Sequence, residues 1–429
     1  MTLIGILFLL ATAVGIFVLP RHLALLPLLM GACYMTGGQS ILIGPFHFTV
    51  LRILIPLGFI RSRLRQEQIV GGYKGMDRLL LMWGAWYLFS SVFHKSIGET
   101  LVYHLGGALD VLGFYFLIRL FCQTKEDLVQ IIKITAFVLV PVAIEMINEK
   151  FTGHNIFGYL GGVPVDTLMR DGKVRAQGPF GHPILAGTVG AFCVPLMIGI
   201  WIQHPRVAKI GLAACLGMVL ASASSGPIMT VAFGVLGLVL WRWRRFTGQM
   251  RIAAVLTYIA CDIFMTRPAY YLLEKIDLTG SSTGYHRAAI IDAGIKHFDE
   301  WWAGGTDYTR HWMPYGVSWS EDHSDITNQY LFSGVNGGFA LMVLFTCMVW
   351  LGFRYTGQTL RLQPKAPFEE QYLIWSMGAM LFAHATTMMS VAYFDQSIMF
   401  FYLNLAVITT MHANALFGAS NINKVNRVI

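Results

Sequence analysis

The sequence predicts an all-α polytopic membrane protein with about 12 or 13 transmembrane helices and one large, partly helical loop. Of its 429 residues, 55% are apolar and only 13% are charged, whereas a soluble domain carries about 25% charged residues. The mean hydropathy of +0.57 excludes a disordered chain, and it argues against a large soluble core. Several apolar runs are also long enough to cross roughly 30 Å of hydrocarbon.

The predicted helices follow the apolar runs in chain order, within one integral membrane domain that covers residues 1–429. The first is interpreted as a membrane helix and not a cleaved signal, because no basic segment precedes it. The second is short and ends at Gly37-Gly38, so a re-entrant or interfacial segment is an alternative. The expected ranges are 2–19, 22–37, 44–60, 79–93, 103–121, 128–147, 180–202, 207–222, 226–241, 252–266, 328–352, 371–391 and 396–415.

Basic residues cluster in connections that alternate along the chain, which predicts that these connections are cytoplasmic. The formal net charge of +8 therefore indicates membrane topology, and we exclude nucleic acid as a partner. The clusters are Arg61, Arg63, Arg65, Lys74 and Arg78; Arg206 and Lys209; Arg242, Arg244, Arg245 and Arg251; and Arg354, Arg361 and Lys365.

Two loops then fall on the opposite, periplasmic side: a smaller one over 148–178 and a large one over 267–326. The large loop is rich in Trp, Tyr, His and Gly, and long loops of this kind are often functional. Inside the apolar runs, Asp110 and Arg52 are charges that either function there or pair with a neighbouring helix. The six cysteines form no CxxC pair or Cys/His cluster, so we expect no metal and no cofactor.

The smaller loop ends in a basic, glycine-containing stretch before Pro183, which suits the first turn of a helix. Lys173, Arg175, Gly178 and His182 would surround the free N–H groups of that turn, which form a natural anion site. A phosphate-bearing lipid head group would fit there. An equally supported interpretation is that Arg175 only pairs with a nearby carboxylate or with lipid phosphates.

The large loop contains a helical pattern that begins at Arg287. Its spacing predicts one stripe facing the membrane body, formed by Arg287, Ile291, Ile295, Phe298 and Trp302. A cation on an inward stripe needs an anionic partner. The alternative is an arginine whose charged end reaches water.

The large loop ends in a dense polar patch that includes Asp322, His323 and Asn328. A histidine beside carboxylates can be held in one tautomer and can act as a general base near neutral pH. The alternative is a solvated loop histidine.

Together, the stretch Arg175–Pro183 and the later His323, Asn328-Gln329-Tyr330-Leu331 and Asn336-Gly337-Gly338 resemble the O-antigen ligase and polymerase superfamily. The resemblance implies a GT-C-like enzyme of the bacterial inner membrane with its active site on the periplasmic side. It also implies an undecaprenyl-diphosphate-linked glycan as donor and an inverting, metal-independent transfer. In that case Arg175 and Arg287 bind the diphosphate, and His323 serves the acceptor hydroxyl.

The chain departs from the family pattern at two places. Members often have Ser-Arg-Gly where this chain has Ser224-Ser225-Gly226, so we expect Arg267 or Arg310 to replace the missing cation. Thr327 stands where many members have histidine, and His323 lies one helical turn earlier.

The sequence therefore favours a membrane glycosyltransferase that polymerises or ligates lipid-linked oligosaccharides for O-antigen, capsule or exopolysaccharide. Polymerisation is weakly favoured over ligation. The expected partners are the lipid-linked glycan, membrane lipid and other polysaccharide assembly proteins. Two alternatives are a transporter or flippase of the same glycans and an accessory subunit of an assembly complex. A transporter should carry cations along several helix interiors, whereas here the polar residues gather on one side.

Overall fold

The computed structural model describes residues 1–275, 284–317 and 320–425, and it is mostly helical. The α-helices of this part are α1 (Leu3–Val18), α2 (Leu26–Tyr34), α3 (Val50–Leu64), α4 (Gly75–Phe89), α5 (Ile97–Ala108), α6 (Phe114–Phe121), α7 (Lys125–Thr152), α8 (Pro183–Gly199), α9 (Pro205–Ala221), α10 (Ser225–Val239), α11 (Thr247–Phe264), α12 (Gly284–Lys296), α13 (Phe298–Trp301), α14 (Gln329–Leu362), α15 (Phe368–Thr387) and α16 (Ile398–Val425). Two antiparallel hairpins pair β1 (Ser40–Ile43) with β2 (Phe46–Thr49), and β3 (Leu168–Arg170) with β4 (Lys173–Arg175). Short turns of helix are η1 (Arg21–Leu23), η2 (Ser90–Phe93), η3 (Leu109–Gly113, a π turn), η4 (Ile156–Leu160), η5 (Leu240–Phe246), η6 (Ala269–Lys275) and η7 (Arg310–Trp312).

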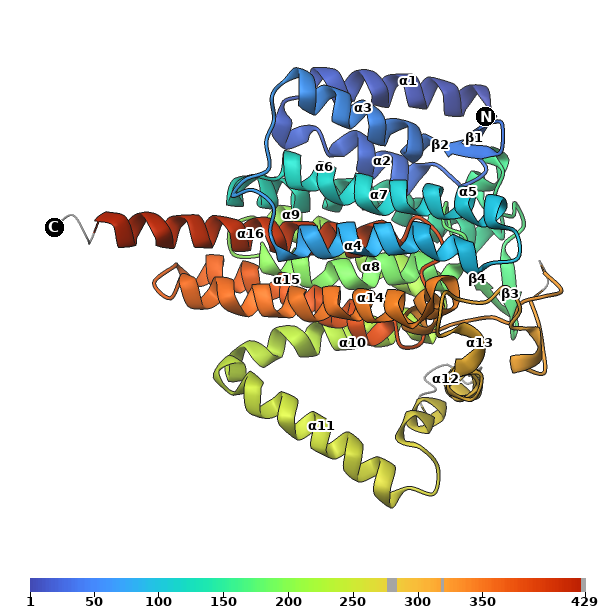
Figure 1. The fold of residues 1–429 in the computed structure, drawn as a ribbon. Coiled ribbons are helices and arrows are strands. Elements are labelled where there is room, and N and C mark those ends of the chain that lie inside the picture. The colour runs from blue at the N-terminus through green and yellow to red at the C-terminus, as the bar shows by residue number, and fades with distance from the viewer. Residues whose placement is uncertain (276–283, 318–319, 426–429) are drawn as a thin grey trace.

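Most of the helices lie side by side in one bundle (Figure 1), and α8 is buried among α9, α10 and α15. Glycines on α8 allow this close packing. A Cβ atom at Gly187 would lie 2.4 Å from Ser222 Oγ, and one at Gly190 would lie 2.6 Å from the carbonyl oxygen of Cys215. As predicted, α8 begins at Pro183.

Within the described residues, five helical segments are long and apolar enough to cross a membrane. They are Ile97–Phe121, Lys125–Thr152, Ser225–Phe264, Gln329–Leu362 and Ile398–Gly418. The shorter helices α1 and α8 are also apolar. The structure therefore supports a mostly helical membrane protein, while the full count of 12 or 13 spans stays a prediction.

Two expected helices near the N-terminus differ from the structure. Residues 22–37 divide into η1 and α2, and the helix expected over 44–60 begins only at Val50. The residues before it form the β1–β2 hairpin, in which Ile43 pairs with Phe46 across Gly44-Pro45. Proline and a glycine with φ of +59° disfavour a helix, and the flanking Ile and Phe residues favour strands.

Helix α11 stands apart from the bundle (Figure 1). None of its residues is buried, and its main contacts are with η5 and η6 at its two ends. Leu256, Ile263 and Phe264 are 60%, 70% and 86% exposed. A helix that is apolar and uncovered on all sides requires an apolar solvent, which supports a membrane environment.

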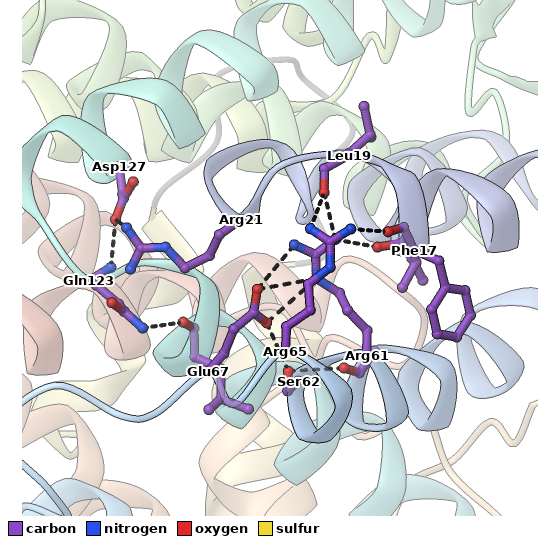
Figure 2. Close-up of polar contacts among 12 residues, drawn as sticks. Phe17, Leu19, Arg21, Arg61, Ser62, Arg65, Glu67, Gln123 and Asp127 are labelled. Atoms are coloured by element: carbon purple, nitrogen blue, oxygen red, sulfur yellow. Dashed lines mark hydrogen bonds and ion pairs between the residues drawn. The ribbon is translucent and has the colours of Figure 1, made fainter.

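The basic last turn of α3 does more than carry charge. Arg61 is fully buried and donates to the carbonyl oxygens of Ile16 and Leu19, and Arg65 also donates to Leu19 (Figure 2). These carbonyls end α1 and lack partners within the helix. Glu67 balances the charge of Arg61 at 3.0 Å. The hydrogen bonds from Arg61 and Arg65 thereby hold α3 against the C-terminal end of α1.

The described part of the large loop packs its own small core on the first turns of α14. This core is formed by Ile290, Ala293, Trp301, Trp312, Met313, Ile326, Leu331 and Val335. The helical geometry of α14 is interrupted at Gly337 and at Gly338, whose φ is +77°. At this break the N–H of Phe339 donates to the carbonyl oxygen of Trp302. The loop is therefore partly helical, as predicted. Residues 276–283 and 318–319 of the predicted loop lie outside the described residues.

Candidate anion-binding site

The β3–β4 hairpin places three cations on one face. Arg170 pairs with Lys173, and Leu168 pairs with Arg175, across the turn Asp171-Gly172. Both turn residues have positive φ, as in the two-residue turns that suit hairpins. Paired residues and next-but-one residues share a face of a hairpin, so the three cations project together. Because like charges across a hairpin repel, this arrangement favours an anion.

These cations lie with Arg287 around one small hollow. The hollow is bounded by the hairpin, by the turn that precedes α10, and by α12. The hollow is lined by Arg170, Asp171, Lys173, Arg175, Ile184, Ala223, Ser224, Ser225, Gly226 and Arg287. Four of these side chains are cationic and one is acidic. The structure thus brings together Arg175 and Arg287, which the sequence analysis paired only through the family resemblance.

Arg175 is the most buried cation of the hollow, with 8% of its surface exposed. Its guanidinium donates to Ser224 Oγ at 2.8 Å. Within the described residues it forms no salt bridge, and its Nε has no hydrogen-bond partner. Burial, followed by the charge of Arg170, lowers the pKa of Arg175. A buried guanidinium without a carboxylate partner is costly unless a ligand supplies the negative charge.

The N-terminal end of α10 adds to the positive potential of the hollow. Among the described residues no side chain caps this helix, and Ser225 and Gly226 of its first turn line the hollow. Uncapped N–H groups and the helix dipole attract anions. The preceding Ala223 has φ of +44°, a strained conformation of the kind that is common at functional sites.

The start of α8, where the sequence predicts the anion site, is closed by its own residues. His182 Nδ1 accepts the Ile184 N–H at 3.1 Å. Burial and then the neighbouring cations Arg175 and Arg170 lower the pKa of His182 to about 4. Gly178 donates its N–H to Glu149 at 2.8 Å. His182 and Gly178 therefore hold the stretch in place, and the open helix end at the hollow is that of α10.

The predicted inward stripe of α12 is wrong in its orientation. Ile295, Phe298 and Trp302 are 61%, 42% and 55% exposed, while the buried face is formed by small residues and Ile290. Gly294 packs against Leu331, where a Cβ would lie 2.7 Å from that side chain. Periodicity identifies an apolar stripe but does not say whether protein or lipid covers it. Arg287 nevertheless reaches the hollow.

His323 is not among the residues that line the hollow. Its Nδ1 lies 2.7 Å from Ser320 Oγ. The segment around it contacts α12, where His286 Nε2 lies 2.9 Å from the carbonyl oxygen of Asp325. His286 immediately precedes Arg287, so the histidine segment and the cationic hollow are neighbours along α12.

The remaining predicted residues of this patch have structural partners. The carbonyl of Asp322 accepts the N–H groups of Thr309 and Arg310. Asn328 caps α14 by accepting the Leu331 N–H at 3.0 Å, and it donates to the carbonyl of Met389.

Neither of the two arginines expected to replace the missing family cation lines the hollow. Arg267 pairs with Glu274 at 3.5 Å and lies over the ring of Tyr271. Arg310 donates to the carbonyls of Met313 and Pro314. Arg170 and Lys173 supply positive charge at Ser224-Ser225-Gly226 instead.

Sequence reasoning missed two features of this end of the molecule. The first is Arg170, which the Asp171-Gly172 turn signal could have placed beside Lys173. The second is a pocket of about 910 Å³ between the β1–β2 hairpin and α5. Arg52 lines that pocket and pairs with Asp110 at 2.8 Å, so these two predicted intramembrane charges neutralise each other.

No protein-family model and no curated protein sequence matches this chain. Four cations, one acidic side chain and an uncapped helix end are suited to a compact ligand with several negative charges, such as a diphosphate.

Proposed function

We propose that this protein is a membrane glycosyltransferase that uses a lipid-diphosphate-linked oligosaccharide as donor, and that it polymerises or ligates surface polysaccharide. The observation that carries the proposal is the convergence of Arg175 and Arg287 on one hollow with Arg170 and Lys173. Buried Arg175, which lacks a salt bridge within the described residues, is the side chain that most needs an anionic ligand.

The chemistry of the transfer fits such a hollow. An acceptor hydroxyl attacks the anomeric carbon, a new glycosidic C–O bond forms, and the bond from that carbon to the diphosphate oxygen breaks. The lipid diphosphate leaves with the bonding electrons, and the hydroxyl proton passes to a base, for which His323 stays our candidate. Arginines that hold the developing charge and position the donor supply most of the required catalysis.

The undecaprenyl identity of the lipid, the bacterial inner membrane and the periplasmic side of the site belong to this proposal. They rest on the resemblance of the Arg175–Pro183 and Asn328–Gly338 stretches to the O-antigen ligase and polymerase superfamily, and on the apolar helices.

The test is incubation of purified protein with a lipid-linked repeat unit, followed by analysis for longer or transferred chains. We expect Arg175→Ala and Arg287→Ala each to lower the rate by about 100-fold, the usual cost of one charge-stabilising donor. His323→Ala tests the base. Arg251→Ala, an exposed arginine on α11, is the matched control and should keep the wild-type rate.

The same assay separates the alternatives. A flippase moves the lipid across a bilayer without forming a glycosidic bond. An accessory subunit shows neither activity, and normal product from all three variants would remove the proposed site.

A further inference from the structure

A second cluster of chemically active side chains lies at the other end of α12, in the large loop. His297, Glu300 and His311 each offer one ligand atom, and these three atoms lie within 4.8 Å of one another. His297 Nδ1 is 2.7 Å and His311 Nε2 is 2.9 Å from the same oxygen, Oε1 of Glu300. The spacing does not reveal this cluster in the sequence, because a third ligand 11 residues after an i, i+3 pair matches no familiar metal motif.

The three side chains are held by their neighbours. The ring of His297 stacks on Trp312, with centroids 5.6 Å apart and planes 10° apart. The ring of His311 stacks on Tyr308 at 5.1 Å, also with 10° between planes. Trp312 Nε1 donates to Glu300 Oε2 at 2.9 Å, which leaves Oε1 facing both imidazoles. Metal ligands are commonly oriented by such outer hydrogen bonds.

From this geometry we propose that His297, Glu300 and His311 form a binding site for a divalent transition metal of the zinc class. Two imidazole nitrogens and one carboxylate oxygen are a familiar zinc ligand set, with the fourth position left to water or to another ligand. Around a tetrahedral ion with bonds of about 2.0–2.1 Å the ligand atoms sit roughly 3.3 Å apart. Each imidazole nitrogen therefore needs to move only about half an ångström away from Glu300 Oε1, while the three ligand atoms, which lie within 4.8 Å of one another, adjust to a common spacing.

The site has a structural role, separate from the anion-binding hollow. His297 is ten residues beyond Arg287, which along a helix corresponds to about 15 Å, too far for one ion to touch a diphosphate in the hollow. The ion would instead join the turn of α13 to η7 and close the segment between them. Metal binding to ligands that come together only in the folded chain stabilises the fold.

The experiment uses the full-length protein in detergent, purified without a histidine tag and treated with chelator. Zinc is titrated by calorimetry, and the d–d absorption of bound Co²⁺ reports the coordination. We expect one equivalent of zinc, a Co²⁺ spectrum of four- or five-coordinate type, and a thermal midpoint that zinc raises.

Matched variants assign the binding to the cluster. His297→Ala and His311→Ala should each weaken zinc binding by at least tenfold and remove the thermal shift. His154→Ala is the control, because His154 is an exposed histidine 3.4 Å from one carboxylate, that of Asp166, and it lies outside the proposed ligand set. Absence of zinc binding by the wild type, or unchanged binding in the His297→Ala/His311→Ala double variant, would overturn the proposal. Neither readout depends on glycosyl transfer.

Discussion

At the scale of single residues, the buried arginines differ in whether their partner is a carboxylate or a neutral group. Arg61 and Arg119 are fully buried and lie 3.0 Å and 3.1 Å from the carboxylates of Glu67 and Asp77. Arg175 is nearly as buried, but its hydrogen bond goes to the neutral hydroxyl of Ser224. The first two satisfy their charge within the protein, because a buried ion needs a counter-ion. The third has no carboxylate partner among the described residues, which supports the proposal that an external anion binds there.

His182 illustrates a residue whose role the sequence could not fix. It lies in the predicted motif, but the structure uses it to cap α8, with its neutral Nδ1 as acceptor. Its pKa is lowered from 6.5 to about 4 by burial and then by the nearby arginines. The unfolded chain therefore binds a proton at a higher pH than the native chain, so His182 contributes stability above pH 6.5 that is lost as the pH falls toward 4.

We expect the thermal midpoint of the wild type to fall more steeply between pH 7 and pH 4 than that of His182→Asn. Asparagine caps helices without binding a proton in this range. The free energies of unfolding of the two proteins should then differ by roughly 2 kcal/mol at pH 4, after allowance for screening by solvent. Parallel pH profiles for the two proteins, followed by circular dichroism, would show that His182 does not titrate as described.

At the scale of elements, sequence patterns identified the helices well and the orientation of their faces poorly. Pro183 marked the start of α8 correctly, because proline at the first helical position is a local signal. The face of α12 was wrong, because whether Ile295 meets protein or lipid depends on distant packing. The convergence of Arg170, Arg175 and Arg287 is also tertiary, since the hairpin and α12 are more than 100 residues apart in the sequence.

The β3–β4 hairpin can be tested as a unit through its turn. Gly172 has φ of +71° and open space around its missing Cβ, so Gly172→Ala strains only the backbone, by about 1–2 kcal/mol. We expect the affinity for an isoprenoid diphosphate to fall about tenfold, because the three cations lose their shared orientation. The unfolding midpoint should change little.

The control for this hairpin test is Gly357→Ala on α14, which also faces open space but has no positive φ. Equal affinity in both variants would show that the turn does not organise the cations.

A fully buried ion pair, Asp77 with Arg119, joins α4 to α6. The carboxylate of Asp77 accepts hydrogen bonds from Arg119 Nε at 3.1 Å and from the hydroxyl of Tyr115 at 2.7 Å. We expect Asp77→Ala to lower the free energy of unfolding by about 3–5 kcal/mol, because it leaves a buried guanidinium without its carboxylate. Asp77→Asn should cost less, since it keeps hydrogen-bond acceptors. Denaturation in detergent measures both, and Asp166→Ala, at a 90% exposed side chain, should have no effect.

At the scale of the whole molecule, the two kinds of charged segment lie at opposite ends of the bundle. The α10–α11 and α14–α15 corners and the C-terminus lie at one end of Figure 1, and β3–β4, α12 and α13 lie at the other. The corners carry the basic clusters that predict the cytoplasmic side, such as Arg242 to Arg251. On that prediction the hollow lies on the far side of the membrane, which is the side that the proposed function requires.

This arrangement predicts which residues a membrane-impermeant thiol reagent reaches in intact cells. Asp171 is exposed at the hairpin turn, with 63% of its side-chain surface accessible, and Arg251 is exposed near the start of α11. We expect Asp171→Cys to react in intact cells and Arg251→Cys to react only after the membrane is permeabilised. The unsubstituted chain gives the background, because four of its six cysteines are buried. Reaction of Arg251→Cys alone in intact cells would place the hollow on the wrong side of the membrane for the proposed donor. Reaction of both positions would contradict the predicted cytoplasmic side of the basic clusters.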